Sequence, residues 1–137
     1  MTLWRIGSHR RLDGAVGLLA PGRWHTQGSR IVYCAPHPAT ELVEILVDAE
    51  IEAGDLPDAL QYLEVEAPDT ISIETVDVDA LCRHWQKDHV ASRLAGDQWL
   101  HAGSAALLRV PSVMVPATWN VLINARHPES AAIRVVR

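Results

Sequence analysis

The chain has little of several features that would point to particular classes of partner. Its 137 residues carry 12 Lys and Arg against 17 Asp and Glu, a formal net charge of -5. Binding to a phosphate backbone is driven by an excess of Lys and Arg, so this deficit argues against a direct nucleic-acid partner. No run approaches the roughly 18 apolar residues of a membrane span, and the N-terminus lacks the apolar segment of a secretory signal. We therefore expect a cytoplasmic protein without a membrane partner.

Motifs of several enzyme classes are also missing. Cys34 and Cys82 fit no metal-binding or redox spacing, and both lie in apolar runs, so we expect two core thiols. The histidines show neither the i, i+4 pairing nor the Cys/His spacing of zinc sites, which predicts that no metal is bound. The glycines form no P-loop or dinucleotide fingerprint, and no serine lies in a nucleophile elbow. Metal-dependent, acyl-transfer and Rossmann-type chemistry thus has no support in the sequence.

The length fits one domain, residues 1–137, and 48% hydrophobic with 21% charged residues is ordinary globular usage. Helices are predicted from Pro38 to Gly54 and from an Asp88 cap to Leu100, whereas residues 7–22 are expected to be mostly loop. Short strands are predicted at 3–6, 30–35, 61–67, 71–74, 105–110, 120–124 and 133–136. This interleaving predicts a single compact α+β domain with mixed, short-stranded sheets and flanking helices.

Three side chains in the first third of the chain are candidates for a site, although each also has a plainer explanation. Arg23 follows a glycine and could bind phosphate as a fork, or it could simply pack on Trp24. Tyr33 lies in a buried-looking strand and could be a core tyrosine with a satisfied hydroxyl. Arg5 alternates with apolar neighbours in a strand, so it meets either solvent or a polar cavity.

Glu44 is the candidate carboxylate. On a helical wheel it shares a sector with Glu41 and Asp48, opposite the face of Leu42 and Ile45. Periodicity alone favours a solvated acidic stripe. The carboxylate becomes functional only if this sector lines a cleft.

A series of short motifs, in this order along nearly the whole chain, resembles the RES-domain family, the toxin halves of bacterial RES–Xre toxin–antitoxin pairs. The motifs are Leu3-Trp4-Arg5, Gly22-Arg23-Trp24, Val32-Tyr33, Glu44-Ile45-Leu46-Val47, Gly96-Asp97-Gln98-Trp99, Leu108-Arg109-Val110-Pro111-Ser112 and Asn120-Val121-Leu122-Ile123-Asn124. The resemblance implies a fold related to ADP-ribosyltransferase toxins, with NAD+ as the substrate.

The resemblance also implies roles for individual residues. Glu44 would take the position of the catalytic carboxylate, and Tyr33 would pack against or hydrogen-bond the nicotinamide–ribose portion. Arg5 and Arg23 would hold the two phosphates of NAD+. These roles agree with the chemistry, because loss of nicotinamide develops oxocarbenium character that a carboxylate stabilises.

Ser112 and Asn120 would add further polar contacts to NAD+. The chain departs from the family pattern at two positions: His25 stands where the family usually has Asn, and Ala125 stands where it usually has Pro. The first departure touches the expected phosphate loop.

Three functions remain open from the sequence. The first is a toxin that degrades NAD+ by hydrolysis or phosphorolysis and is neutralised by an Xre-like helix-turn-helix antitoxin, with which it forms a hetero-oligomer. The second is a mono-ADP-ribosyltransferase that modifies a cellular protein. The third is an inactive relative that binds its partner or a nucleotide without turnover.

Overall fold

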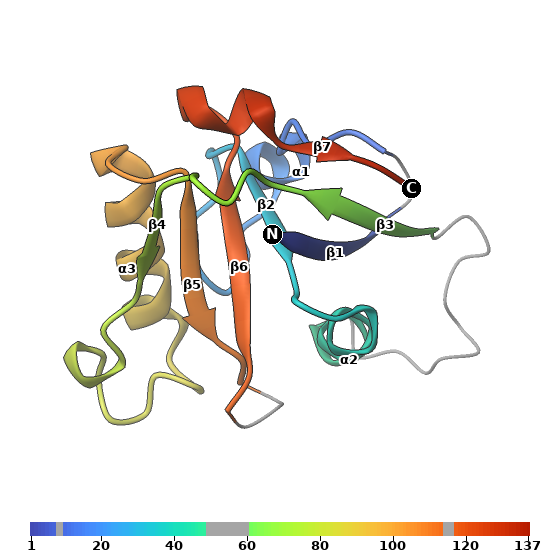
Figure 1. The fold of residues 1–137 in the computed structure, drawn as a ribbon. Helices are drawn as coiled ribbons and strands as arrows, with labels where there is room; N and C mark the ends of the chain where they lie inside the picture. Colours follow the sequence, from blue (N-terminus) through green and yellow to red (C-terminus); the bar gives the residue numbers. More distant parts are fainter. Residues whose placement is uncertain (8–9, 49–60, 114–116) are drawn as a thin grey trace.

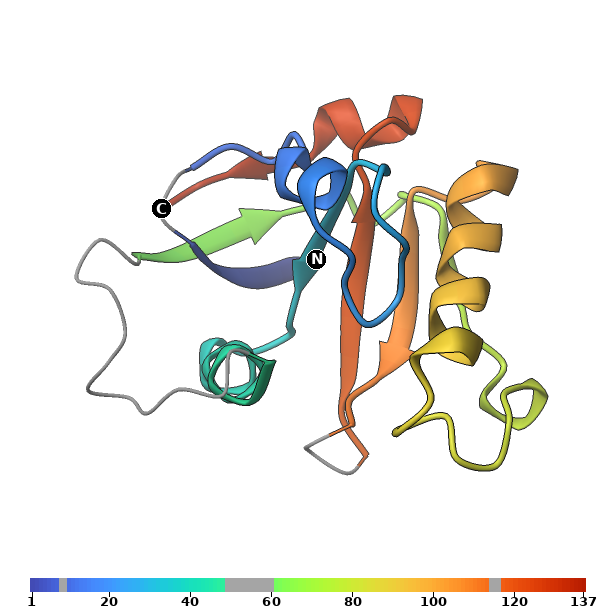
Figure 2. The ribbon, with the colours of Figure 1, turned by 180° about the vertical axis from the view of Figure 1, so that it is seen from behind.

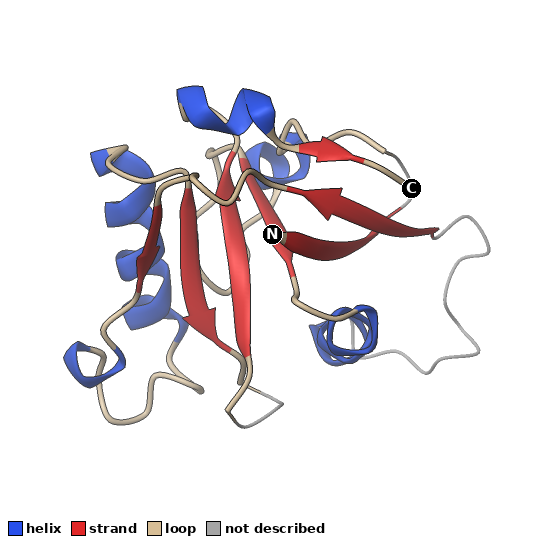
Figure 3. Cartoon of the chain, in the orientation of Figure 1, coloured by secondary structure: helices blue, strands red, loops and turns tan. Residues whose placement is uncertain are grey.

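The structure, a computed structural model, describes residues 1–7, 10–48, 61–113 and 117–137 (Figure 1). Within them, strands and helices form one mixed architecture, which confirms the predicted α+β class (Figure 3). The strands are β1 (Thr2–Gly7), β2 (Ile31–Cys34), β3 (Gln61–Glu66), β4 (Ile73–Thr75), β5 (Leu107–Pro111), β6 (Trp119–Asn124) and β7 (Arg134–Val135). The helical segments are α1 (Ala15–Leu19), α2 (Pro38–Asp48), α3 (His89–Ala102) and the 3-10 turns η2 (Val78–Ala80) and η3 (Pro128–Ala132).

A backbone bridge joins the two sheets. The smaller sheet has the order β1-β3-β7 and is antiparallel, while the larger has the order β2-β6-β5-β4, with a parallel β4–β5 pair. Trp4 of β1 and Ala35, just after β2, exchange two backbone hydrogen bonds: Trp4 N–H donates to the Ala35 carbonyl at 2.8 Å, and Ala35 N–H donates back at 2.9 Å. The bridge brings the middle of β1 beside the end of β2.

Strands β2, β5 and β6 of the larger sheet carry buried residues on both faces. Val32 and Cys34 of β2 join Leu3 of β1 and Val65 of β3 in one apolar cluster. The alternate residue Ile31 belongs to a second cluster, shared with the tryptophans Trp24, Trp85 and Trp99 and with the sheet residues Leu108, Val110 and Leu122. Figure 2 shows α3, which carries Trp99, beside this sheet. Alternation along the strands therefore supplies two cores at once.

Helix α3 begins at the predicted Asp88 cap and ends at Ala102, two residues after the predicted end at Leu100. The Asp88 carboxylate caps it by accepting from Val90 N–H at 2.9 Å, and Gly103 ends it in a left-handed conformation. Two apolar residues of this helix, Val90 and Leu94, are 75% and 57% exposed. The buried positions are instead Ser92, Gly96 and Trp99. Small residues on this face let the helix lie close to the backbone of a neighbouring loop.

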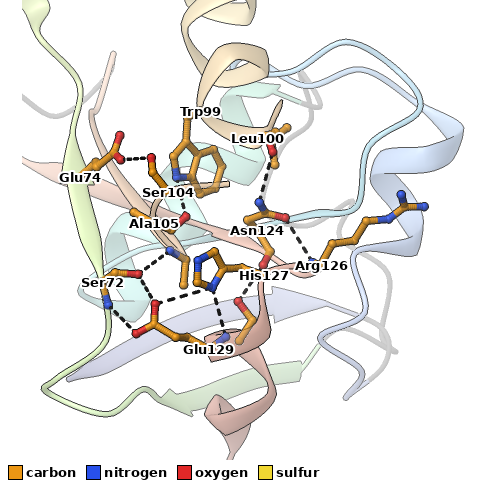
Figure 4. Close-up of polar contacts among 12 residues, drawn as sticks. Ser72, Glu74, Trp99, Leu100, Ser104, Ala105, Asn124, Arg126, His127 and Glu129 are labelled. Atoms are coloured by element: carbon orange, nitrogen blue, oxygen red, sulfur yellow. Dashed lines mark hydrogen bonds and ion pairs between the residues drawn. The ribbon is translucent and has the colours of Figure 1, made fainter. Parts of the chain in front are cut away.

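Polar contacts fix the C-terminal turn η3 to the larger sheet (Figure 4). The Glu129 carboxylate accepts from the hydroxyl of Ser72 and, at 3.3 Å, from its backbone N–H. The hydroxyl oxygen of Ser72 in turn accepts from Ala106 N–H at 2.9 Å. The Ser72 hydroxyl bond lowers the pKa of Glu129. The chain after β6 is thereby anchored beside the start of β5.

Several local predictions need correction. Cys34 is buried, and burial raises the pKa of its thiol, but Cys82 is exposed and is not a core thiol. The segment 7–22 contains the short helix α1, and the strand predicted at 71–74 forms two residues later, at Ile73–Thr75. The predicted end of the second helix at Gly54 lies outside the described residues. Among those described, none of the helices combines the length and apolarity of a bilayer span.

Replacing Gly96 with alanine is expected to lower the free energy of unfolding by about 3 kcal/mol, the upper end of the usual cost of overpacking. A Cβ at this position would lie 1.6 Å from the carbonyl oxygen of Trp24, a backbone atom that cannot rotate away. Urea unfolding measures the change. Gln98→Ala, an exposed substitution in the same helix, serves as the control and should stay within about 0.5 kcal/mol of the wild type. Equal stability of the two variants would show that α3 does not contact Trp24 closely.

Candidate active site

A cavity of about 300 Å³ lies where the two sheets, α2 and the segment before β2 meet. Its lining includes five of the six side chains predicted from the sequence: Arg5, Arg23, Tyr33, Glu44 and Asn120. The sixth, Ser112, makes a direct contact with Glu44. Residues that are distant in the sequence thus converge in one place.

Glu44 is held by two donors from the β5–β6 pair. The hydroxyl of Ser112, the residue after β5, donates to Glu44 Oε1, and Asn120 Nδ2 donates to the same oxygen at 3.1 Å. Glu41, one helical turn earlier, is buried and also lines the cavity. The acidic sector of α2 therefore faces the cavity at these two positions and is not a solvated stripe.

Two polar atoms of the lining residues have no hydrogen-bond partner within the part of the chain that the structure describes. One is the donor Arg5 Nη1, and the other is the acceptor Asn120 Oδ1; both atoms are buried. The amide of Asn120 cannot be turned around without facing its oxygen to the Glu44 carboxylate, so its acceptor is directed away from Glu44. Buried polar groups without partners are costly. An unpartnered donor and acceptor in one cavity therefore indicate a place for a ligand.

Arg23 lies at the tip of a tight turn before β2. The turn is closed by Gly22 N–H donating to the carbonyl of His25 at 3.1 Å. Arg23 lines the cavity, and its Nη1 donates to the backbone carbonyl of Gln86 at 3.0 Å. Its neighbour Trp24 is buried and packs against Trp85 with ring centroids 5.6 Å apart. One donor of the Arg23 fork is therefore already engaged by the protein.

Tyr33 combines both of its predicted characters: it lines the cavity, and its hydroxyl is satisfied by the protein. The hydroxyl oxygen accepts from Trp24 N–H at 3.2 Å and lies 2.7 Å from His25 Nδ1. The same turn passes so close that a Cβ on Gly22 would lie 2.4 Å from this oxygen. A glycine is required there because of this approach.

His25 appears in the sequence only as a departure from the family pattern, but its side chain is a structural partner of the site. It is 2% exposed, and Nε2 lies 3.1 Å from the carbonyl of Ala20. Burial lowers the pKa of His25, against the opposing effects of the Gly17 and Ala20 carbonyls and of Asp97. The neutral ring is therefore favoured. No sequence signal reveals this role, because the contact depends on how the turn folds back.

Helix α3 holds the same turn through backbone carbonyls. Ser92 Oγ donates to the carbonyl of Arg23 at 2.6 Å, and Arg93 Nε donates to the carbonyl of Gly22 at 2.7 Å. Neither residue was predicted to belong to the site. Their contacts join elements about 70 residues apart, which local sequence patterns do not report.

The motif Gly96-Asp97-Gln98-Trp99 now has a physical purpose. Gly96 admits the Trp24 carbonyl, and Asp97 accepts from the backbone and hydroxyl of Thr26, at 3.0 and 2.8 Å. Trp99 Nε1 donates to the carbonyl of Ala105 at 3.0 Å, tying the helix to the sheet. The motif therefore supports the loop that lines the cavity.

The groups that line the cavity include a carboxylate, guanidinium groups and an aromatic ring, and a single small molecule could contact all of them. This set suits a ligand with an anionic group, hydroxyls and a flat ring. Among the described residues, no three His, Cys, Asp or Glu side chains gather as metal ligands.

Known proteins are similar to this chain in sequence and in fold. The model of the RES domain matches residues 2–137. The chain is 38% identical over 135 residues to the Toxin Res of Pseudomonas putida, covering 98% of this chain and 92% of that protein. It is 35% identical over 144 residues to the Prs ADP-ribosylating toxin of a Sphingobium species, covering 97% and 88%.

Among solved structures, a chain of the M. tuberculosis MbcT–MbcA toxin–antitoxin complex shares the fold with a TM-score of 0.70. The two are 13% identical, and the match covers 99% of this chain and 81% of that one. Because the family model spans almost the full sequence and two relatives exceed 30% identity, the chain belongs to the RES-domain family.

Proposed function

We propose that this protein is the toxin of a toxin–antitoxin pair and consumes NAD+ by cleaving the bond between nicotinamide and ribose. The observation that carries the proposal is the placement of Glu44, held at one oxygen by Ser112 and Asn120, in the same cavity as Arg5 and Tyr33. Membership of the RES-domain family and the names of the relatives support it.

In the proposed reaction the nicotinamide leaves with the electron pair of the glycosidic bond, and positive charge develops on the ribose. Glu44 Oε2 accepts a hydrogen bond from a ribose hydroxyl, and the carboxylate stabilises the developing charge. Ser112 and Asn120 keep the carboxylate oriented by binding Oε1. Water then bonds to the anomeric carbon through its oxygen and loses a proton to solvent, giving ADP-ribose; if inorganic phosphate bonds there through an anionic oxygen, the product is the phosphorylated form.

The remaining groups bind and orient NAD+. The ring of Tyr33 packs against the nicotinamide, and Arg5 and Arg23 bind the two phosphates. A volume of about 300 Å³ is at the small end for ligand pockets. The cavity therefore takes the nicotinamide–ribose half, while the adenosine half extends toward its mouth. Fixing both ends of the scissile bond supplies part of the rate enhancement.

The proposed partner is an Xre-like helix-turn-helix antitoxin that binds this protein in the cytoplasm and covers the cavity. Similarity to a chain of the MbcT–MbcA toxin–antitoxin complex supports an antitoxin as the partner.

A second candidate is mono-ADP-ribosyl transfer to a cellular protein, which keeps the same bond cleavage and changes the acceptor. It is favoured by the 35% identity to a relative named as a Prs ADP-ribosylating toxin. Labelled NAD+, incubated with the enzyme and lysate proteins, separates the two: a discrete labelled protein band supports transfer, whereas ADP-ribose or its phosphate as the sole product supports degradation.

Antitoxin-free wild-type protein is expected to release nicotinamide from NAD+, and Glu44→Gln should lower kcat by roughly 100-fold or more, the usual effect of removing a transition-state electrostatic contact. The near-isosteric amide should leave the melting temperature almost unchanged. Chromatography of the nicotinamide product measures the rate. In cells, wild-type expression should arrest growth and the variant should not.

Glu74→Gln is the matched control, because the Glu74 carboxylate also accepts from a serine hydroxyl, that of Ser104, away from the cavity (Figure 4). It should retain wild-type kcat. If wild-type protein yields neither nicotinamide nor an ADP-ribosyl product, with phosphate and lysate present, the enzyme proposal fails and the inactive binding module takes its place.

Arg5→Lys is expected to weaken NAD+ binding about tenfold, and Arg23→Lys by less. Both substitutions lose the bidentate fork. Arg5 has a donor, Nη1, without a partner among the described residues, whereas Arg23 already binds the Gln86 carbonyl. Calorimetric titration in the Glu44→Gln background measures affinity without turnover. Exposed Arg134→Lys is the control. A larger loss for Arg23→Lys would reverse the assigned order of the two arginines.

A further inference from the structure

We infer that His25 is a positioning residue that fixes the Tyr33 hydroxyl, so that Tyr33 presents its ring face to the substrate and not its O–H. The inference rests on the proposed function for its kinetic consequences. Its structural part, the state of the Tyr33 hydroxyl, stands independently of any activity.

The direction of each hydrogen bond follows from the two contacts of the imidazole. A backbone carbonyl only accepts, so the 3.1 Å contact with Ala20 requires the proton on Nε2. In a neutral ring Nδ1 is then an acceptor, and at 2.7 Å it receives the hydrogen of the Tyr33 hydroxyl. The histidine thus links the end of the α1 segment to β2 through the side chain of Tyr33.

The hydroxyl of Tyr33 therefore has its one hydrogen committed to His25 while its oxygen accepts from Trp24 N–H. A phenol has no second hydrogen to give a ligand. Tyr33 is left with its ring as the group that meets the nicotinamide. Held at the hydroxyl by two partners, the ring loses little freedom when the substrate binds.

The neighbouring charges do not disturb this arrangement. His25 is 2% exposed, and of the groups around it Asp97 favours the protonated ring while Arg93 opposes it. Asp97 itself is engaged by Thr26, and Arg93 by the carbonyl of Gly22. Asp97 and Arg93 shift the pKa of His25 in opposite directions, and burial lowers this pKa as Arg93 does.

Two amide substitutions separate the two contacts of His25. The asparagine oxygen is bonded to Cγ, as Nδ1 is, so His25→Asn can still accept from Tyr33. The glutamine amide extends one atom further, toward the place of Nε2, so His25→Gln can bind the Ala20 carbonyl but not the hydroxyl. The kcat/KM of His25→Gln is expected to be about tenfold lower than that of His25→Asn. This is the change in rate that corresponds to the free energy of one hydrogen bond.

A double-mutant cycle with Tyr33→Phe tests whether His25 acts through the hydroxyl. In the Tyr33→Phe background there is no hydroxyl to hold, so His25→Asn and His25→Gln should differ by less than about twofold in kcat/KM. A tenfold difference that persists in that background would overturn the inference, because His25 would then act through another group. His101→Gln, at an exposed histidine, controls for loss of imidazole.

The chain offers a readout that needs no turnover, because it has two tyrosines, Tyr33 and the 53% exposed Tyr62. With tyrosine labelled by 13C at Cζ, two NMR signals report the two hydroxyls, and Tyr62 is the internal reference. The Tyr33 signal should stay close to its wild-type position in His25→Asn and move toward that of Tyr62 in His25→Gln.

The two proposals fail in different ways. If wild-type protein does not cleave NAD+ but the Tyr33 signal moves only in His25→Gln, the proposed function is wrong and the His25 contact stands. If NAD+ is cleaved but the signal is the same in both variants, or moves in both, His25 does not position Tyr33 through Nδ1.

Discussion

The pair of backbone hydrogen bonds between Trp4 and Ala35 is the constraint on which the site depends. It is the point at which the two sheets are joined, and it sets the end of β2 beside β1. Arg5 follows Trp4 directly, and Tyr33 precedes Ala35 by two residues, so the bridge places a guanidinium and an aromatic ring on the same cavity. Helix α2 starts three residues after Ala35, which brings Glu44 to the third side of that cavity.

The second support comes from the far end of the chain. Helix α3 holds the turn at residues 22–25 by donating to its carbonyls, and the β5–β6 pair delivers Ser112 and Asn120 to Glu44. All four of these hydrogen bonds join residues that lie 68 to 76 positions apart in the sequence. The cavity is therefore a property of the whole domain, which agrees with family motifs that are spread along the entire chain.

The sequence predicted the α+β class, the Asp88 cap of α3 and most strands, because alternation and capping are local signals. The candidate site residues were predicted from the order of the motifs along the chain. The helical periodicity around Glu44 alone favoured a solvated acidic stripe. Three features of the structure could not be predicted from the sequence. The periodicity of α3 did not reveal that the helix docks through Ser92 and Gly96, whereas Val90 and Leu94 are exposed. The exposure of Cys82 and the partner of His25 also depend on tertiary contacts that no local pattern encodes.

The same contacts bear on the departure from the family pattern at position 25. What Tyr33 requires there is an acceptor one bond from Cγ, and both imidazole Nδ1 and an asparagine oxygen provide it. Exchanging the usual Asn for His therefore conserves the hydrogen bond to the hydroxyl while changing the residue. The imidazole adds a donor for the Ala20 carbonyl, which an asparagine bound to Tyr33 reaches less readily. On this geometry the departure is a chemical equivalent at the site and gives no reason to regard the chain as an inactive relative.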